Sequence, residues 1–273
     1  ETFGADVTVL PYEWGQAAAP EDVAKALAAD PAIKAVLVTH NETSTGVTNP
    51  LEEIARVVRE TDRLLLVDAV SSLGAIPLDT DGWGLDAVVT GSQKGWMVPP
   101  GLAFVCLSER AWKANESARM PRFYFDAAKH RDLLHKGQTP WTPTVSVFFG
   151  LDVALERMAV EGLESIHARH AAIARIVRER VKALGLELLA ADERYASSTV
   201  TAIKCPEGVE VKALRTMLED EHGVVVAGGQ GKLAGKIFRI GHLGLVSEDD
   251  IRHALDALSE ALPRVGFNIP VSR

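Results

Sequence analysis

Polar side chains gather directly after three short apolar runs in the first half of the chain. The polar segments are 40–46 (HNETSTG), 68–72 (DAVSS) and 91–95 (GSQKG), and the apolar runs before them are 35–39, 64–67 and 87–90. The carboxyl ends of the strands in an open α/β sheet line its ligand crevice. The spacing therefore predicts that the three polar segments converge on one site.

Lys94 and Asp68 carry the most distinctive chemistry in these segments. Each alone has an ordinary interpretation, Lys94 as a hydrated loop lysine and Asp68 as a turn cap at the end of a strand. A lysine that loses its hydration in a crevice can act as the nucleophile that forms a Schiff base. Pyridoxal phosphate needs such a lysine, together with an acidic partner for its pyridinium nitrogen. The pair therefore favours a pyridoxal-phosphate site.

The elements that must position these residues alternate between strands and helices. Continuous apolar strands separated by helical patterns are typical of an α/β fold, with a mostly parallel sheet and helices on both faces. The second half begins with two long helical patterns, 144–161 and 163–184, and continues with short strands between helices. We expect a large domain over residues 1–161 and a smaller α+β domain over residues 162–273.

The composition excludes several classes of function. The chain has 273 residues, with 29 Lys and Arg against 37 Asp and Glu, which gives a net charge of −8. A nucleic-acid surface needs a basic face that displaces counterions, and a membrane helix needs about 20 consecutive apolar residues. The two cysteines, Cys106 and Cys205, make no disulfide framework. We therefore expect a cytoplasmic protein that binds neither nucleic acid nor a membrane.

Two histidine pairs have spacings that a metal could use. They are His130 with His135 and His167 with His170. Because no set of Cys or carboxylate ligands completes either pair, we expect no metal site and histidines that face solvent.

Five motifs in order carry a resemblance over nearly the whole chain. They are HNETSTG (40–46), DAVSS (68–72), GSQKG with the following PPG (91–95 and 99–101), TPWTP (139–143) and FRIGHLG (238–244). Together they resemble the class V, fold type I, pyridoxal-phosphate aminotransferases, in particular the alanine–glyoxylate and serine–glyoxylate aminotransferases. That group usually has glycine where this sequence has Asn41. Any one of the motifs alone would be a weak signal.

The resemblance implies a role for each residue that faces the cofactor ring. Lys94 would form the aldimine, and Asp68 would keep the pyridine nitrogen protonated. Val70 would pack on one face of the ring, and Thr43 would form a hydrogen bond near the ring hydroxyl. A protonated pyridine is the stronger electron sink, which is the physical reason for a carboxylate at Asp68.

Further roles concern the phosphate and the substrate. The resemblance implies that Gln93 contacts the phosphate and that Thr142 reaches the phosphate of the neighbouring subunit in a homodimer. Arg239 resembles the arginine that binds the substrate α-carboxylate, since a guanidinium matches a carboxylate at two points. The expected reaction moves an amino group from alanine or serine to a 2-oxo acid such as glyoxylate or pyruvate.

Two other functions remain open at this stage. Another class V activity, chiefly cysteine desulfurase, needs a nucleophilic cysteine on a mobile loop in the second half. Cys205 lies before Pro206, loop 227–235 has no cysteine, and desulfurases usually have histidine where Gln93 stands. The third possibility is an inactive fragment, because the resemblance implies that the phosphate-binding loop and the ring-stacking aromatic precede Glu1. On that basis we expect these 273 residues alone to hold the cofactor poorly.

Overall fold

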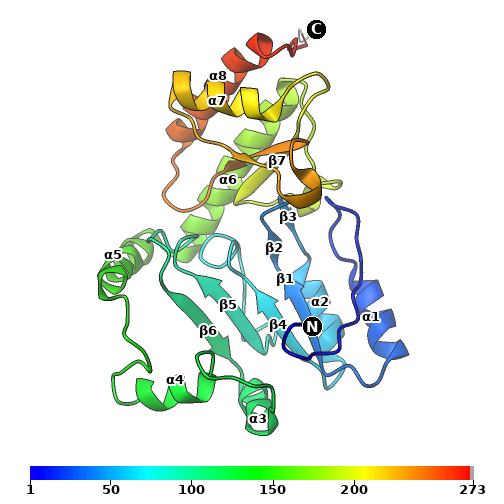
Figure 1. Ribbon diagram of the computed structural model, residues 1–273, viewed down its shortest axis with the longest axis vertical. Helices are drawn as coiled ribbons and strands as arrows, with labels where there is room; N and C mark the ends of the chain where they lie inside the picture. The colour runs from blue at the N-terminus through cyan, green and yellow to red at the C-terminus, as the bar shows by residue number, and fades with distance from the viewer. Residues whose placement is uncertain (271–273) are drawn as a thin grey trace.

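The computed structural model describes residues 1–270. Its first sheet has the strand order β1-β4-β5-β6, and Figure 1 shows it in the lower half of the molecule. The strands are β1 (Ala35–Thr39), β4 (Leu64–Asp68), β5 (Ala87–Gly91) and β6 (Ala103–Leu107). Strands β1, β4 and β5 run parallel, whereas β6 is antiparallel to β5. The predicted α/β fold with a mostly parallel sheet is confirmed, whereas the expected helices on both faces are found on one face only among the described residues.

Helices α1 (Pro20–Ala29) and α2 (Leu51–Arg59) cover one face of this sheet. Their apolar residues share a core with alternate residues of the strands, because side chains alternate across a sheet. On the opposite face, Leu37 is 76% exposed and Val105 is 59% exposed. The side chain of Asp68 belongs to this open face, since the register pairs Asp68 with Val89, which is also exposed.

Two short helices and one long helix follow β6. They are α3 (Glu109–Ser117), α4 (Ala127–Leu134) and α5 (Val145–Glu161). The sequence pattern predicted only α5, because α3 and α4 bury no residue and so lack an apolar stripe. Gly162, with a φ of 81°, separates α5 from α6 (Leu163–Ala183). The proposed division at 161/162 stays a prediction.

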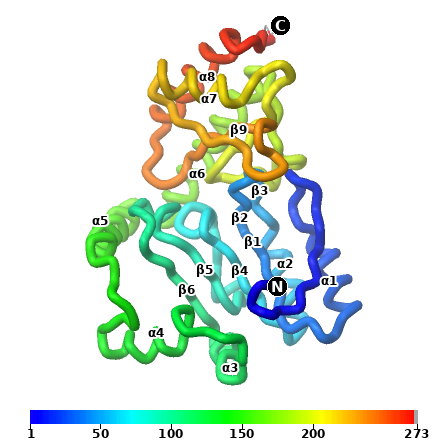
Figure 2. Tube along the Cα trace, in the orientation of Figure 1, coloured from blue at the N-terminus to red at the C-terminus, as the bar shows by residue number. Residues whose placement is uncertain are grey.

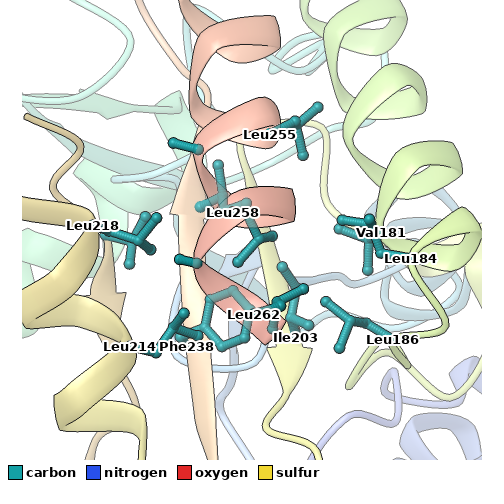
Figure 3. Packing of buried hydrophobic residues seen from close by; sticks show 14 of the residues in the cluster. Val181, Leu184, Leu186, Ile203, Leu214, Leu218, Phe238, Leu255, Leu258 and Leu262 are labelled. Atoms are coloured by element: carbon teal, nitrogen blue, oxygen red, sulfur yellow. The ribbon is translucent and has the colours of Figure 1, made fainter. Parts of the chain in front are cut away.

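The second sheet is antiparallel and carries helices on one side (Figure 1). Its order is β7-β9-β8, with β7 (Val200–Lys204), β8 (Ala227–Gly228) and β9 (Ile237–Gly241). Helices α6, α7 (Val211–His222) and α8 (Glu248–Arg264) pack on it around Phe238, Leu214, Ile203 and Leu258 (Figure 3). Short 3₁₀ turns occur at Glu193–Tyr195 and Gly231–Leu233. None of the described helices is both long and apolar enough to span a bilayer.

A two-stranded hairpin joins the two sheets. It consists of β2 (Asn41–Glu42) and β3 (Val47–Thr48), which pair directly after β1. In the tube view this hairpin rises from the first sheet toward the second (Figure 2). Val47 forms an isolated bridge with Ala196, and the amide of Ser197 donates to the carbonyl of Gly46 at 2.9 Å. The hairpin therefore contacts the second sheet through its backbone.

Three local predictions are wrong. The strand-like composition of residues 6–10 predicts a strand, but these residues form none, because no neighbouring strand pairs with their backbone among the described residues. The run Asn49-Pro50-Leu51-Glu52 predicts a helix start with Asn49 as its N-cap. Asn49 does not cap α2, since its side-chain amide accepts from Ala18 N at 2.7 Å and donates to Thr39 O at 2.7 Å. His170 is buried rather than solvated, at 1% exposed.

The turns that follow β4 and β5 touch through their backbones. A Cβ atom at Gly95 would lie 2.7 Å from Leu73 O and 3.2 Å from Gly74 C. Such distances are too short for any side chain, and backbone atoms cannot rotate away. Glycine at position 95 therefore lets the turn that carries Lys94 lie against the turn that follows Asp68.

We expect Gly95→Ala to destabilise the protein by about 1–3 kcal/mol, the usual cost of forcing a methyl group into packed atoms. Urea unfolding of both proteins measures the difference. Gly150→Ala is the matched control, because its Cβ would meet only Val98 Cγ1 at 3.4 Å, an ordinary contact. Equal stability of the two variants would contradict the backbone contact.

His242 directly follows β9 in the chain and is a fully buried, neutral histidine. Its Nδ1 lies 3.1 Å from Ser198 O, which can only accept, so Nδ1 carries the proton. Nε2 then accepts from the Thr201 hydroxyl at 2.8 Å. Burial lowers the pKa of His242 from 6.5 to about 4, and burial does the same for His40.

The two histidines should make the protein less stable as the pH is lowered from about 6.5 toward 4. The unfolded chain takes up a proton on each ring near its ordinary pKa of about 6.5, whereas the folded protein resists protonation until near 4. Each contributes up to about 3 kcal/mol above pH 6.5, which is lost as the pH falls toward 4. Urea unfolding across this range should show a shallower pH slope for His242→Asn. The exposed His130→Asn should keep the parental slope.

Candidate active site

Asp68 ends β4 at the carboxyl edge of the first sheet. Its Oδ1 accepts from the Val70 amide at 2.9 Å, which closes a local turn. The same residue is tied to β1, because its carbonyl accepts from His40 N at 2.8 Å. Oδ2 accepts no hydrogen bond from any described residue, and the side chain is exposed. The turn therefore aims a free carboxylate oxygen at the open face.

Lys94 lies in a tight turn after β5. The amide of Met97 donates to Lys94 O at 3.0 Å, and Val98 N donates to Ser92 O at 3.2 Å. Buried Ser92 anchors the turn, since its hydroxyl donates to Pro99 O at 2.8 Å. Met97 has a φ of 62°, the left-handed conformation that favours glycine, so the turn is strained. No described residue forms a hydrogen bond or an ion pair with the half-buried Lys94 amine.

Arg239 lies on β9 and is a buried residue, at 6% exposed. Nε donates to Gly228 O at 3.0 Å, and Nη1 donates to Thr43 O at 2.9 Å. Burial lowers the pKa of Arg239, attraction to Glu42 opposes that shift, and the guanidinium remains a cation at neutral pH. Nη2 has no partner among the described residues, so it can still receive an anion.

Loop 242–246, which follows β9, lies beside the Lys94 turn. A Cβ at Gly244 would lie 3.3 Å from Met97 Cγ and 3.9 Å from Lys94 O. Helix α6 holds this loop, because Arg169 Nη1 donates to Gly244 O at 2.8 Å and His170 Nε2 accepts from Gly244 N at 3.0 Å. The loop that follows Arg239 thus lies against the turn that carries Lys94, and Gly95 lets that same turn lie against the one that follows Asp68.

Of the remaining predicted residues, Thr43, Val70 and Gln93 lie near the Asp68 and Lys94 turns, whereas Thr142 lies elsewhere. Half-buried Thr43 and Val70 lie on the hairpin and on the Asp68 turn, within this edge. Gln93 is exposed beside Lys94, and its Oε1 would be 2.9 Å from a Cβ at Gly91. Thr142 is exposed in the loop between α4 and α5, and no described contact brings it to Lys94.

Sequence reasoning missed Arg169 and His170, which hold Gly244. They lie 75 and 74 positions from that glycine, so no local pattern indicates the contact. Arg169 is itself fixed by Glu161, with Nε 2.6 Å from Oε1, and this pairing lowers the pKa of the Glu161 carboxyl. A charged residue on an amphipathic helix has the same sequence signal whether it faces water or a loop.

The chemistry of this edge fits pyridoxal phosphate. A free carboxylate at Asp68 can pair with a protonated ring nitrogen, and the unpaired amine of Lys94 can bind an aldehyde. The exposed amide of Gln93 can donate to a phosphate, and the apolar side chain of Val70 can lie on a ring face. A carboxylate substrate fits the free nitrogen of Arg239.

Comparison with known proteins agrees with this chemistry. A family model described as aminotransferase class-V matches residues 1–240. The chain is 46% identical over 270 residues to the soluble hydrogenase, small subunit, of Synechococcus sp. (strain PCC 6716), covering 98% of this chain and 70% of that protein. It is 39% identical over 278 residues to the serine–glyoxylate aminotransferase of Methylorubrum extorquens, covering 98% and 69%.

A solved structure gives the same result. The crystal structure of pyridoxamine–pyruvate aminotransferase from Mesorhizobium loti matches with a TM-score of 0.90 and 37% identity, over 93% of this chain and 66% of that chain. The similarity thus extends through both sheets and the hairpin between them. The chain belongs to the class V aminotransferases, and its similarity to named aminotransferases of this family makes it a pyridoxal-phosphate-dependent enzyme of amino transfer.

Proposed function

We propose that this protein transfers the amino group of a small amino acid, such as alanine or serine, to glyoxylate or pyruvate. The observation that carries the proposal is the placement of Arg239. Its guanidinium is held beside the edge that contains Asp68 and Lys94, and Nη2 is free. Amino acids and 2-oxo acids share the carboxylate that this nitrogen can bind.

The names of the relatives support this substrate class. Two of them are a serine–glyoxylate and a pyridoxamine–pyruvate aminotransferase. The Synechococcus relative is named as a hydrogenase subunit, but that name applies to the relative and is not carried over to this chain. Amino transfer accounts for the Lys94–Asp68–Arg239 arrangement of this chain, so we propose it here.

Each residue would have a separate task in the reaction. Pyridoxal phosphate, when bound, supplies the electron sink that allows a proton to leave the substrate Cα. Arg239 would hold the substrate carboxylate and so fix the direction of the Cα–H bond. The Lys94 amine, once freed, would accept the proton from the substrate Cα as a general base. It would then donate that proton to C4′ of the cofactor as a general acid. Asp68 would keep a proton on the ring nitrogen by its negative charge.

The assembly is also a proposal. We propose a cytoplasmic homodimer in which Thr142 contacts the phosphate bound by the other subunit. Large apolar side chains are exposed around the 139–143 loop and on α5, including Phe123, Phe125 and Phe149. Exposed large apolar side chains are typical of a protein–protein interface, and they support the dimer.

Cysteine desulfurase is less well supported. The Cys205 thiol is half-buried and donates to Val209 O at 3.2 Å. Burial raises the pKa of Cys205, which disfavours the thiolate that such chemistry requires. Loop 227–235, which lies near Arg239 through Gly228, contains no cysteine.

A donor panel tests the proposed function. We expect the full-length protein with pyridoxal phosphate to convert glyoxylate or pyruvate to its amino acid with alanine or serine as donor, and to release no sulfide from cysteine. Product amino acids are measured by chromatography and sulfide by colorimetry. Sulfide release without amino transfer would overturn the proposal.

We expect Lys94 to be the residue that carries the cofactor. Its amine has no partner among the described residues and lies at the edge that contains Asp68. Borohydride reduction of the loaded protein followed by peptide mapping should therefore mark Lys94. A label on Lys113 or Lys129 instead would refute the assignment.

We expect Asp68→Asn to cut turnover while leaving the fold intact. Loss of the charged partner should cost about 2–4 kcal/mol in the transition state. Asp86→Asn is the contrasting variant, because Asp86 is buried and accepts from Leu65 N at 2.9 Å and from the Ser108 hydroxyl at 2.7 Å. That change should lower the unfolding midpoint, whereas turnover per folded molecule should persist. Near-parental turnover of Asp68→Asn would make Asp68 a turn cap only.

We expect Arg239→Lys to raise KM about tenfold or more for both substrates, since lysine cannot match a carboxylate at two points. Steady-state kinetics with each substrate varied measures the change. Arg215→Lys is the matched control, because Arg215 also donates to a carbonyl of this region, Val226 O at 2.8 Å. Similar kinetics for both variants would place Arg239 outside the site.

A further inference from the structure

The amide of Asn41 connects three parts of the chain in the interior of the protein. Asn41 is 3% exposed at the start of the β2–β3 hairpin. Nδ2 donates to Ser71 Oγ at 2.8 Å and to Thr199 Oγ1 at 3.0 Å. Oδ1 accepts from the Thr48 hydroxyl at 2.7 Å. Both ends of the amide are thus satisfied, and its partners lie on the Asp68 turn, at the residue directly before β7 of the second sheet, and on the hairpin itself.

We infer that Asn41 is a positioning residue, whose amide holds the hairpin between the Asp68 turn and the second sheet and thereby sets where Arg239 lies relative to Asp68. This inference rests on the proposed function, because it concerns how the substrate carboxylate is placed. Asn41 itself is not assigned a contact with the cofactor or the substrate.

The Thr199 hydroxyl completes the connection. It donates to Ser71 O at 3.0 Å and lies 3.1 Å from Ser197 Oγ, in addition to accepting from Asn41. Ser71 and Thr199 are 128 positions apart and both are buried. The Ser71 hydroxyl in turn donates to Asn41 O at 2.7 Å. The start of β7 is therefore bonded to the turn that Asp68 begins.

Strand pairing transmits this position to Arg239. The carbonyl of Thr199 accepts from His242 N at 2.8 Å, and the register then pairs Val200 with Gly241 and Ala202 with Arg239. A strand cannot shift against its partner without breaking every bond of the ladder. The position of Thr199 consequently determines the position of Arg239 along β9.

A second hydrogen bond connects the hairpin directly to Arg239. Arg239 Nη1 donates to Thr43 O, and Thr43 lies two residues after Asn41. The hairpin is thus bonded to the second sheet at Asn41 and at Thr43. Hydrogen bonds between buried polar groups have fixed directions and are costly to leave unmade. Apolar packing alone would allow the hairpin to slide, and a carboxylate held by Arg239 would move with it.

Thr199→Val tests the inference, because valine keeps the shape of threonine and removes the hydroxyl. In the full-length protein with pyridoxal phosphate, we expect KM for the amino donor and for the oxo acid to rise about five- to tenfold. The kcat and the cofactor Kd should stay within about twofold of the parent. Thr199→Ser keeps the hydroxyl and should restore KM to within about twofold.

Thr201→Val is the matched control. Thr201 is buried two residues further on, in β7, and its hydroxyl contacts His242, which directly follows β9. This variant loses a buried hydrogen bond of the same kind, so it should lose stability without the rise in KM. The double variant Asn41→Ala/Thr199→Val should raise KM no further than Asn41→Ala alone, since both changes remove one connection.

Hydrogen exchange separates this inference from the proposed function. Without substrate, we expect amides of residues 41–48 to exchange at least about tenfold faster in Thr199→Val than in the parent and in Thr201→Val. If the parent shows no amino transfer, the proposed function fails while exchange still reports the connection. Parental exchange in Thr199→Val, a parental KM in that variant, or an equal rise in KM in Thr201→Val would each overturn the inference.

Discussion

The buried guanidinium of Arg239 is the constraint on which the arrangement of the two sheets depends. A charge removed from water is costly unless its N–H groups find acceptors. Two of them find carbonyls, from Gly228 on β8 and from Thr43 on the hairpin, and Thr43 is 196 positions away along the chain. The hairpin must therefore remain against the second sheet, because otherwise the buried cation would lose its hydrogen bond to the Thr43 carbonyl. Because the hairpin follows β1 directly, the same requirement fixes the second sheet relative to the edge where Asp68 lies.

The Lys94 turn shows how close packing and strain coexist at that edge. Gly95 allows backbone contact with the turn after β4, and the strained residue Met97 lies against Gly244. Strained conformations persist only where the surroundings over-determine them. Here Ser92 anchors one end of the turn and α6 holds the opposing loop through Arg169 and His170. The lysine is consequently presented by a rigid turn, although its own side chain is free.

The two sheets differ in how they are covered. The second sheet packs against three helices around a core of large aliphatic residues (Figure 3). The first sheet has helices on one face, and Leu37, Val89 and Val105 are exposed on the other. Asp68 shares that open face. The densely packed second sheet thus serves as the fixed support from which Arg239 and the Gly244 loop are presented, and the Asp68 edge remains accessible.

The sequence by itself determined the elements whose signals are local. Continuous apolar runs predicted β1, β4 and β5, and two long helical patterns predicted α5 and α6. The order of the five motifs identified the family, and the spacing of Asp68 and Lys94 after their strands predicted that both lie at one edge. Each of these signals consists of residues that are close together in the chain, so it can be recognised without knowing the tertiary contacts.

Tertiary structure decided everything that depends on distant partners. Residues 6–10 have a strand-like composition but no pairing strand, and Asn49 bonds Ala18 and Thr39 instead of capping α2. His170 has the sequence signal of a solvated helix residue, yet it is buried because a loop 74 positions away covers it. Asn41 and Thr199 are 158 positions apart. The physical reason for this division is that a hydrogen bond between distant residues forms only when the fold brings donor and acceptor together. The sequence shows the donor and the acceptor separately, and it does not show that they meet.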